Sequence, residues 1–96
     1  MRLRELIHEQ GDVIARTAAT SGARDVRLFG SVARGEERES SDIDFLVTLD
    51  PGRTLLDLAR LEDALEQLLG RRVDVVTEGA LREPVRATAL REAIRV

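Results

Sequence analysis

Three aspartates and one Gly-Ser pair are the residues of this sequence whose types and spacing could do chemistry. Asp42 and Asp44 open an apolar run within residues 28–47, LFGSVARGEERESSDIDFLV. Because alternate residues of a strand point the same way, both carboxylates would project from one face, about 6.5–7 Å apart along the chain. Their repulsion, about 4 kcal/mol at 4 Å and an effective dielectric of 20, must be offset by a proton, an arginine or a divalent cation.

The surroundings of this pair favour a divalent cation with a phosphate ligand. Carboxylate oxygens with no His or Cys nearby favour Mg²⁺, or Mn²⁺, over zinc. Gly30-Ser31 directly follows the preceding apolar run, where glycine lets a ligand approach the backbone. The Ser31 hydroxyl and neighbouring N–H groups would bond phosphate oxygens. The combination indicates a nucleoside triphosphate that is bound together with its metal.

Asp74 is the candidate for a third carboxylate. It lies in RRVDVVT, between Val73 and Val75, where burial would be costly without a partner. If its strand neighbours that of Asp44, Asp74 would face the pair, bind metal and help to deprotonate an attacking hydroxyl. Two metal ions about 3.5–4 Å apart would then clamp the attacking and leaving oxygens of an in-line displacement.

The elements that must position these residues follow from apolar spacing and from turn signals. The pattern predicts helices over Arg2–Thr20, from a Thr54 cap to Gly70, and over Pro84–Ile94, and strands over Val26–Phe29, Ile43–Leu49 and Arg72–Thr77. The connector 30–41 has room for one helical turn, over 32–35, but is marginal for a parallel crossover. We therefore expect an α/β (α+β) fold, with a small mixed sheet of three to four strands and helices packed on it.

Composition limits the class of protein. Ninety-six residues, 43% of them hydrophobic, predict a single domain over 1–96. The chain has no cysteine, and all 15 of its basic residues are arginine, so thiol and lysine chemistry are excluded. A net charge of −3 argues against general nucleic-acid binding. We find no signal peptide and no membrane-spanning run, and expect a cytoplasmic protein with no membrane partner.

The Gly-Ser and Asp-x-Asp stretch resembles the signature of the DNA polymerase β-like nucleotidyltransferases. Gly-Ser-x-Ala-Arg-Gly followed by Ser-Asp-Ile-Asp is similar to the minimal nucleotidyltransferase branch, and the likeness extends to VDVVTEGAL, so it covers nearly the whole chain. The resemblance implies that Gly30 and Ser31 bind the triphosphate, that Asp42 and Asp44 hold the metals, and that Asp74 is the third acidic position.

The same resemblance implies an activity and a partner. Family members transfer a nucleoside monophosphate to a hydroxyl and release pyrophosphate. Many minimal members are antitoxins of a HEPN-domain toxin and are thought to attach AMP to its tyrosine. We therefore expect AMP transfer from ATP, with two Mg²⁺ ions, to a HEPN toxin. This chain has no tyrosine, so a tyrosine acceptor would lie on another chain.

The oligomeric state stays open, and a homo-oligomer is among the options. Two other functions also stay open. One is a non-catalytic antitoxin that masks its partner by binding. The other is a small-molecule nucleotidyltransferase of the aminoglycoside-modifying kind, which would need an acceptor site from a partner or a second copy.

Some residues near the motif have competing interpretations. Arg34 either contacts a phosphate or a partner, as its place in the motif suggests, or pairs with Glu36 or Glu37. Phe29 and Phe45 are expected in the core, with base stacking as the alternative.

Overall fold

The computed structural model describes residues 2–96. Its helices are α1 (Leu3–Glu9), α2 (Gly11–Thr20), α3 (Gly30–Arg34), α4 (Leu55–Leu69) and α5 (Val85–Glu92), with a 3-10 turn, η1, at Glu78–Ala80. Its strands are β1 (Ala23–Phe29), β2 (Ile43–Leu49), β3 (Val73–Thr77) and β4 (Ile94–Arg95). None of the helices within residues 2–96 has the length and apolarity that a bilayer crossing needs.

The four strands form one mixed sheet in the order β3-β2-β1-β4. β1 runs antiparallel to β2 and to β4, whereas β2 and β3 are parallel. The short connector after β1 leads into the antiparallel strand β2, and the longer connection through α4 leads into the parallel strand β3. A parallel strand must begin at the same end of the sheet as its neighbour, and only the longer connection can carry the chain back to that end. The predicted mixed α/β fold is confirmed.

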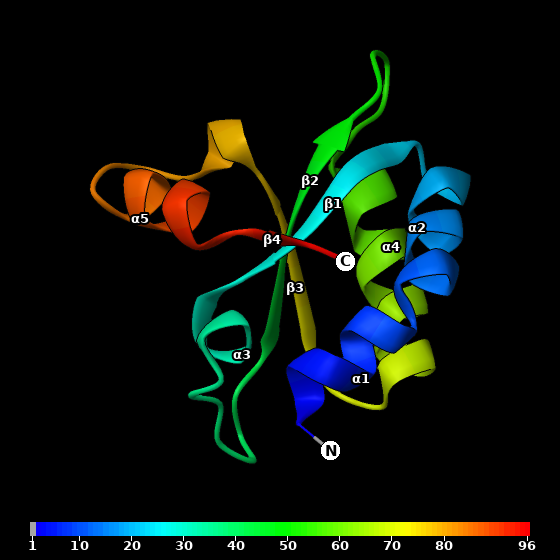
Figure 1. Ribbon diagram of the computed structural model, residues 1–96. Coiled ribbons are helices and arrows are strands. Elements are labelled where there is room, and N and C mark those ends of the chain that lie inside the picture. Colours follow the sequence, from blue (N-terminus) through cyan, green and yellow to red (C-terminus); the bar gives the residue numbers. More distant parts are fainter. Residues whose placement is uncertain (1) are drawn as a thin grey trace.

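The helices cover the two faces of the sheet in separate groups (Figure 1). α2 and α4 lie on one side, and α3 and α5 lie on the other. The alternate residues Ile43, Phe45 and Val47 of β2 belong to the main core cluster together with Leu61 and Leu65 of α4. The intervening residues of β2, which include Asp44, therefore face the side that carries α3 and α5.

The α4 helix forms as the sequence predicts. The Thr54 side chain accepts a hydrogen bond from Leu56 N–H, and the Asp57 carboxylate accepts one from Thr54 N–H at 2.8 Å, which completes a capping box. Gly70 ends the helix with a left-handed φ of 69°.

Four predicted boundaries are wrong. The helical turn expected over 32–35 is α3, which begins at Gly30 and ends at Arg34. The single helix expected over 2–20 breaks at Gln10, and Gly11, the first residue of α2, leaves room for the Val96 backbone, because a β-carbon there would lie 2.8 Å from the Val96 carbonyl carbon. β1 begins at Ala23, earlier than expected, because Ala23 pairs with Leu49. The last helix stops at Glu92 since Ile94 pairs with Leu28 and becomes part of β4.

Candidate active site

Asp44 and Asp74 are register partners on the adjacent parallel strands β2 and β3. Register partners project from the same face of a sheet, so the two carboxylates lie side by side. Asp44 is partly buried, while Asp74 is exposed. The sequence argument required the strands of Asp44 and Asp74 to be neighbours. They are neighbours, and α4 makes the connection between them.

The Asp44 carboxyl is held in an environment that opposes its ionisation. Burial, followed by the nearby charges of Asp74 and Asp42, raises its pKa from 3.8 to about 6, against a smaller opposing effect of Arg34. The carboxyl thus lies among surplus negative charge, and this is the setting in which a cation or a proton is stabilised.

Asp42 precedes β2 and lies near an arginine. Its Oδ1 is 3.8 Å from Nε of Arg72, which stands two residues before Asp74 just as Asp42 stands two before Asp44. Among residues 2–96, no three Asp, Glu or His side chains stand close enough, as they are oriented, to enclose a metal ion. The donor set nonetheless fits a hard divalent cation, because Asp44 is the register partner of Asp74 and the negative charges of both Asp74 and Asp42 act on its carboxyl.

Gly30 begins α3 directly against Asp44. Gly30 has φ of +78°, and a β-carbon there would lie 2.4 Å from Asp44 Oδ2. The absent side chain therefore lets the turn after β1 pass over the carboxylate. Ser31 follows as the second residue of α3, whose first N–H groups have no partner within the helix. Donors suited to an anion thus adjoin carboxylates suited to a cation.

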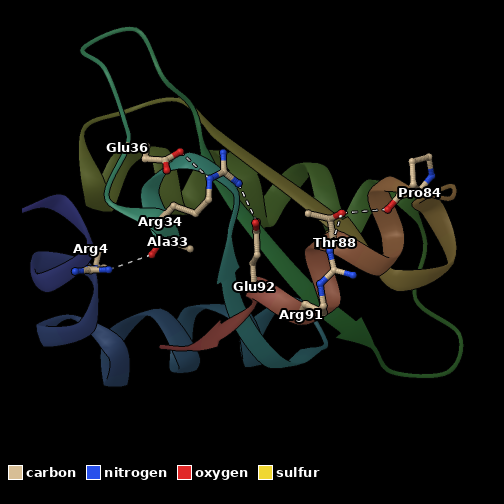
Figure 2. Close-up of polar contacts among 8 residues, drawn as sticks. All are labelled: Arg4, Ala33, Arg34, Glu36, Pro84, Thr88, Arg91 and Glu92. Atoms are coloured by element: carbon tan, nitrogen blue, oxygen red, sulfur yellow. Dashed lines mark hydrogen bonds and ion pairs between the residues drawn. The ribbon is translucent and has the colours of Figure 1, made fainter.

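Arg34 is held by two carboxylates (Figure 2). Its Nε donates to Glu36 Oε2 at 3.0 Å, and its Nη1 donates to Glu92 Oε2 on α5 at 2.8 Å. The sequence interpretation that pairs Arg34 with Glu36 is thus present in the structure, and Glu92 joins it from a distant part of the chain. On the other side of α3, Arg4 Nη1 donates to the Ala33 carbonyl at 3.3 Å and ties α1 to this helix.

A cleft of about 230 Å³ opens beside this turn. Its lining consists of Phe29, Gly30, Arg34, Pro84, Val85, Thr88, Ala89 and Glu92. Phe45 is fully buried in the core as predicted, whereas Phe29 is only half-buried and forms part of the cleft wall.

Two glutamates that the sequence analysis did not single out line the outer edge of β3. Glu62 Oε2 accepts the Val75 N–H at 2.8 Å, and Glu66 Oε2 accepts the Val73 N–H at 2.9 Å. Burial and the nearby Asp74 charge raise the pKa of Glu62. The sequence spacing is consistent with this pairing. Glu62 and Glu66 are four residues apart on a helix, a rise of about 6 Å, which matches the distance between two alternate residues of a strand.

The fold and the paired aspartates define a class of protein. A family model for the nucleotidyltransferase domain matches residues 15–96, and the chain belongs to this family. The nucleotidyltransferase resemblance found in the sequence is thereby confirmed.

Individual relatives narrow the class. The chain is 44% identical over 75 residues to the protein adenylyltransferase MntA of Thermococcus cleftensis, a match that covers 78% of this chain and 76% of the relative. A protein of Methanocaldococcus jannaschii, provisionally named a protein adenylyltransferase, is also 44% identical over 75 residues, with 78% and 81% covered.

Solved structures agree with this assignment. A protein provisionally named a minimal nucleotidyltransferase superposes with a TM-score of 0.86 at 52% identity, over 100% of this chain and 97% of the other. A toxin–antitoxin structure with AMP-PNP superposes with a TM-score of 0.74 at 20% identity, over 88% and 70% of the two chains, which shows a shared fold.

Proposed function

We propose that this nucleotidyltransferase transfers AMP from ATP to a hydroxyl of a partner protein, with Mg²⁺ or Mn²⁺ held by Asp42, Asp44 and Asp74. The observation that carries the proposal is the pairing of Asp44 with Asp74 directly beneath the Gly30 turn. Carboxylates and phosphate-binding donors are then within reach of one bound triphosphate with its metal.

The Gly30–Ser31 turn binds the phosphates in this scheme. Its free N–H groups and the Ser31 hydroxyl donate hydrogen bonds to phosphate oxygens. The adjoining cleft, about 230 Å³ in volume, provides room for the nucleoside. Arg34 lines the same cleft and, on leaving Glu92, would contact a phosphate oxygen as the motif suggests.

Asp42 and Asp44 supply the oxygens for the cations, together with Asp74. Bound Mg²⁺ would neutralise phosphate charge and ease loss of the acceptor's proton. Asp42 would turn away from Arg72, a contact that costs little to break because it spans 3.8 Å and the Arg72 side chain is 86% exposed. Asp44 must be ionised in this state, so near or below pH 6, where its raised pKa keeps it protonated, the proton leaves when the cation enters.

The transfer itself forms one bond and breaks another. The acceptor oxygen attacks the α-phosphorus of ATP, and the bond from that phosphorus to the bridging oxygen breaks to release pyrophosphate. Asp74 is the more exposed of the paired carboxylates and accepts the proton of the attacking hydroxyl. ATP thus becomes a phosphodiester on the acceptor plus pyrophosphate.

The acceptor we propose is a tyrosine of a HEPN-domain toxin in the cytoplasm, for which this chain would be the antitoxin. A relative of this chain is named a protein adenylyltransferase, and a protein of the same fold was solved in a toxin–antitoxin structure. The absence of tyrosine from this chain supports an acceptor on a second protein.

The test is to mix the chain with a candidate HEPN-domain partner, labelled ATP and Mg²⁺. Label on the partner, with a mass increase matching one or more AMP groups, is the expected result. Asp44→Ala and Asp74→Ala should abolish labelling while circular dichroism stays unchanged.

Three outcomes would contradict the proposal. Neutralisation of the partner without label would indicate a masking antitoxin, and unchanged labelling by either aspartate variant would remove the assigned site. Label on an added aminoglycoside instead of the protein would indicate a small-molecule enzyme.

A further inference from the structure

The segment that leads into Asp42 has no regular secondary structure of its own. Residues 36–42 lie between α3 and β2, and Asp42 itself precedes the first residue of β2. The position of the Asp42 carboxylate therefore depends on what holds the residues directly before it. We call residues 36–41 the 36–41 loop.

Arg71 holds the loop through a single nitrogen. Its Nη2 lies 2.8 Å from the Arg38 carbonyl oxygen, 3.2 Å from that of Glu39 and 2.9 Å from that of Ser41. Carbonyl oxygens that converge on a guanidinium form charge-assisted hydrogen bonds, which are stronger than neutral ones. The last of these three carbonyls belongs to the residue directly before Asp42.

The loop also closes on itself around the same residues. The Arg38 N–H donates to Ser41 Oγ at 2.8 Å, and the Ser41 N–H donates to the Arg38 carbonyl at 3.0 Å. These two bonds shape the turn, while Arg71 fixes the turn to the rest of the molecule.

Arg71 also lies close to the strand of the third aspartate. It stands two residues before the start of β3, and the neighbouring Arg72 carbonyl accepts the Ile43 N–H at 2.9 Å. One side chain thus connects the loop directly before Asp42 to the residues directly before the strand of Asp74.

We propose that Arg71 is a positioning residue for the cation site, which presents the Asp42 carboxylate beside Asp44 by binding the carbonyls of the 36–41 loop. The inference rests on the proposed function, because it requires Asp42 to be a metal ligand. Arg71 does not touch substrate or metal in this arrangement and acts only through the loop.

The direction in which cation affinity changes when Arg71 is removed distinguishes a positioning role from a simple charge effect. A positive charge near a cation site repels the cation, so removal of Arg71 would strengthen cation binding on Coulombic grounds alone. Loss of positioning has the opposite consequence, because Asp42 would have to be ordered at the moment of binding. Removal of Arg71 should therefore weaken binding.

The experiment measures binding of Mn²⁺ alone to the whole chain, from the electron paramagnetic resonance signal of free Mn²⁺. Arg71→Met should weaken binding about tenfold, the lower end of the range seen when residues that orient metal ligands are removed. Arg60→Met is the matched control, because it deletes the same charge from an exposed position of α4. The control should bind Mn²⁺ as the wild type does.

A second variant covers the case in which Arg71→Met does not fold. Ser41→Ala removes only the hydroxyl that accepts the Arg38 N–H, without any change of charge. It should weaken Mn²⁺ binding in the same direction, while thermal unfolding without metal stays close to that of the wild type.

The outcomes distinguish this inference from the proposed function. Equal or tighter Mn²⁺ binding by Arg71→Met, or by Ser41→Ala where the first variant is unfolded, would overturn the positioning role and leave the metal site intact. A wild-type chain that binds no Mn²⁺ would overturn the proposed function and this inference together.

Discussion

The position of the Asp44 carboxylate depends on the absence of a side chain at Gly30. A β-carbon on Gly30 would lie 2.4 Å from Asp44 Oδ2 and 3.3 Å from its Cγ, and the Gly30 backbone has a left-handed φ of +78°. Glycine is thus required twice at this position, once for conformation and once for space.

Gly30→Ala should therefore impair both stability and transfer. The left-handed conformation costs about 1–2 kcal/mol for a residue with a β-carbon. The new methyl group would also push Asp44 away from Asp74, so we expect transfer to fall by about a hundredfold, as misplacement of a reacting group by about 1 Å can do. Denaturant unfolding and AMP transfer measure the two effects.

Gly52→Ala is the matched control for this variant. Gly52 has a similar φ of +84° but nothing within 4 Å of the position of a β-carbon. It should lose comparable stability and keep its transfer rate. Equal losses of transfer in both variants would mean that backbone strain, and not the contact with Asp44, explains the defect.

Asp44→Asn should make the chain more stable at neutral pH. The pKa of Asp44 is raised from 3.8 to about 6 in the folded state. The protonated carboxyl therefore contributes to folding stability fully below about pH 3.8, and this contribution is lost as pH rises through 6. Since one pKa unit corresponds to about 1.4 kcal/mol and the group is only half-buried, we expect a gain of about 1 kcal/mol above pH 6 after allowance for solvent screening.

Unfolding experiments across the acid range check this prediction. The stability advantage of Asp44→Asn should vanish below about pH 4, where the wild-type carboxyl is protonated in both states. Asp63→Asn, which removes a charge from an exposed position of α4, serves as the control. A constant difference between Asp44→Asn and the wild type at every pH would contradict the raised pKa.

Cation binding should show the complementary pH dependence. Protons compete with a cation for Asp44, so Mn²⁺ affinity should rise as pH increases towards about 6 and level off above it. Asp74→Asn removes a charge that raises the pKa of Asp44, so the titration midpoint of Asp44 should move down. Carboxyl NMR of the metal-free chain measures that midpoint, and an unmoved midpoint would mean that Asp74 does not act on Asp44.

The parts of the site that could be predicted are those set by local rules. Alternation along β2 predicted that Asp44 faces away from the core residues Ile43 and Phe45, and the capping box at Thr54 fixed where the crossover helix begins. A crossover of that length allows a parallel step, but the adjacency of Asp74 and Asp44 was only a condition of the sequence argument, and the structure supplies it.

The parts that could not be predicted depend on contacts between distant segments. Glu92 reaches Arg34 across 58 residues, and Arg71 reaches the 36–41 loop across 30 or more. No periodicity or turn signal encodes such pairs. The short β4 strand was missed for the same reason, because the pairing of Ile94 with Leu28 overrides a local helical pattern.

Glu92→Gln should increase the affinity for ATP if Arg34 contacts phosphate. Glu92 holds Arg34 Nη1 at 2.8 Å, and the Arg34 side chain is 39% exposed, so loss of the pair should change stability little. The released guanidinium would bind a phosphate without first breaking this bond, and we expect the affinity for ATP to increase about fivefold.

Binding of a non-hydrolysable ATP analogue by calorimetry tests this prediction, with two further variants for comparison. Arg34→Met should bind the analogue more weakly than the wild type. Asp50→Asn breaks another exposed pair, with Arg24 at 3.2 Å, and should leave affinity unchanged. Weaker binding by Glu92→Gln would show that Glu92 orients Arg34 for the nucleotide and does not compete with it.

The outer edge of β3 is closed by the Glu62 and Glu66 carboxylates, which accept the Val75 and Val73 N–H groups at 2.8 and 2.9 Å. An edge strand with free N–H groups invites pairing with another chain, so Glu62→Ala with Glu66→Ala should promote self-association. Each substitution should also cost about 1–2 kcal/mol of folding stability, since a partly buried donor loses its acceptor.

Analytical ultracentrifugation measures the self-association and denaturant unfolding measures the stability, with Asp63→Ala on the same helix as the control. A double variant that stays as monodisperse and as stable as this control would mean that the two glutamates do not protect the edge.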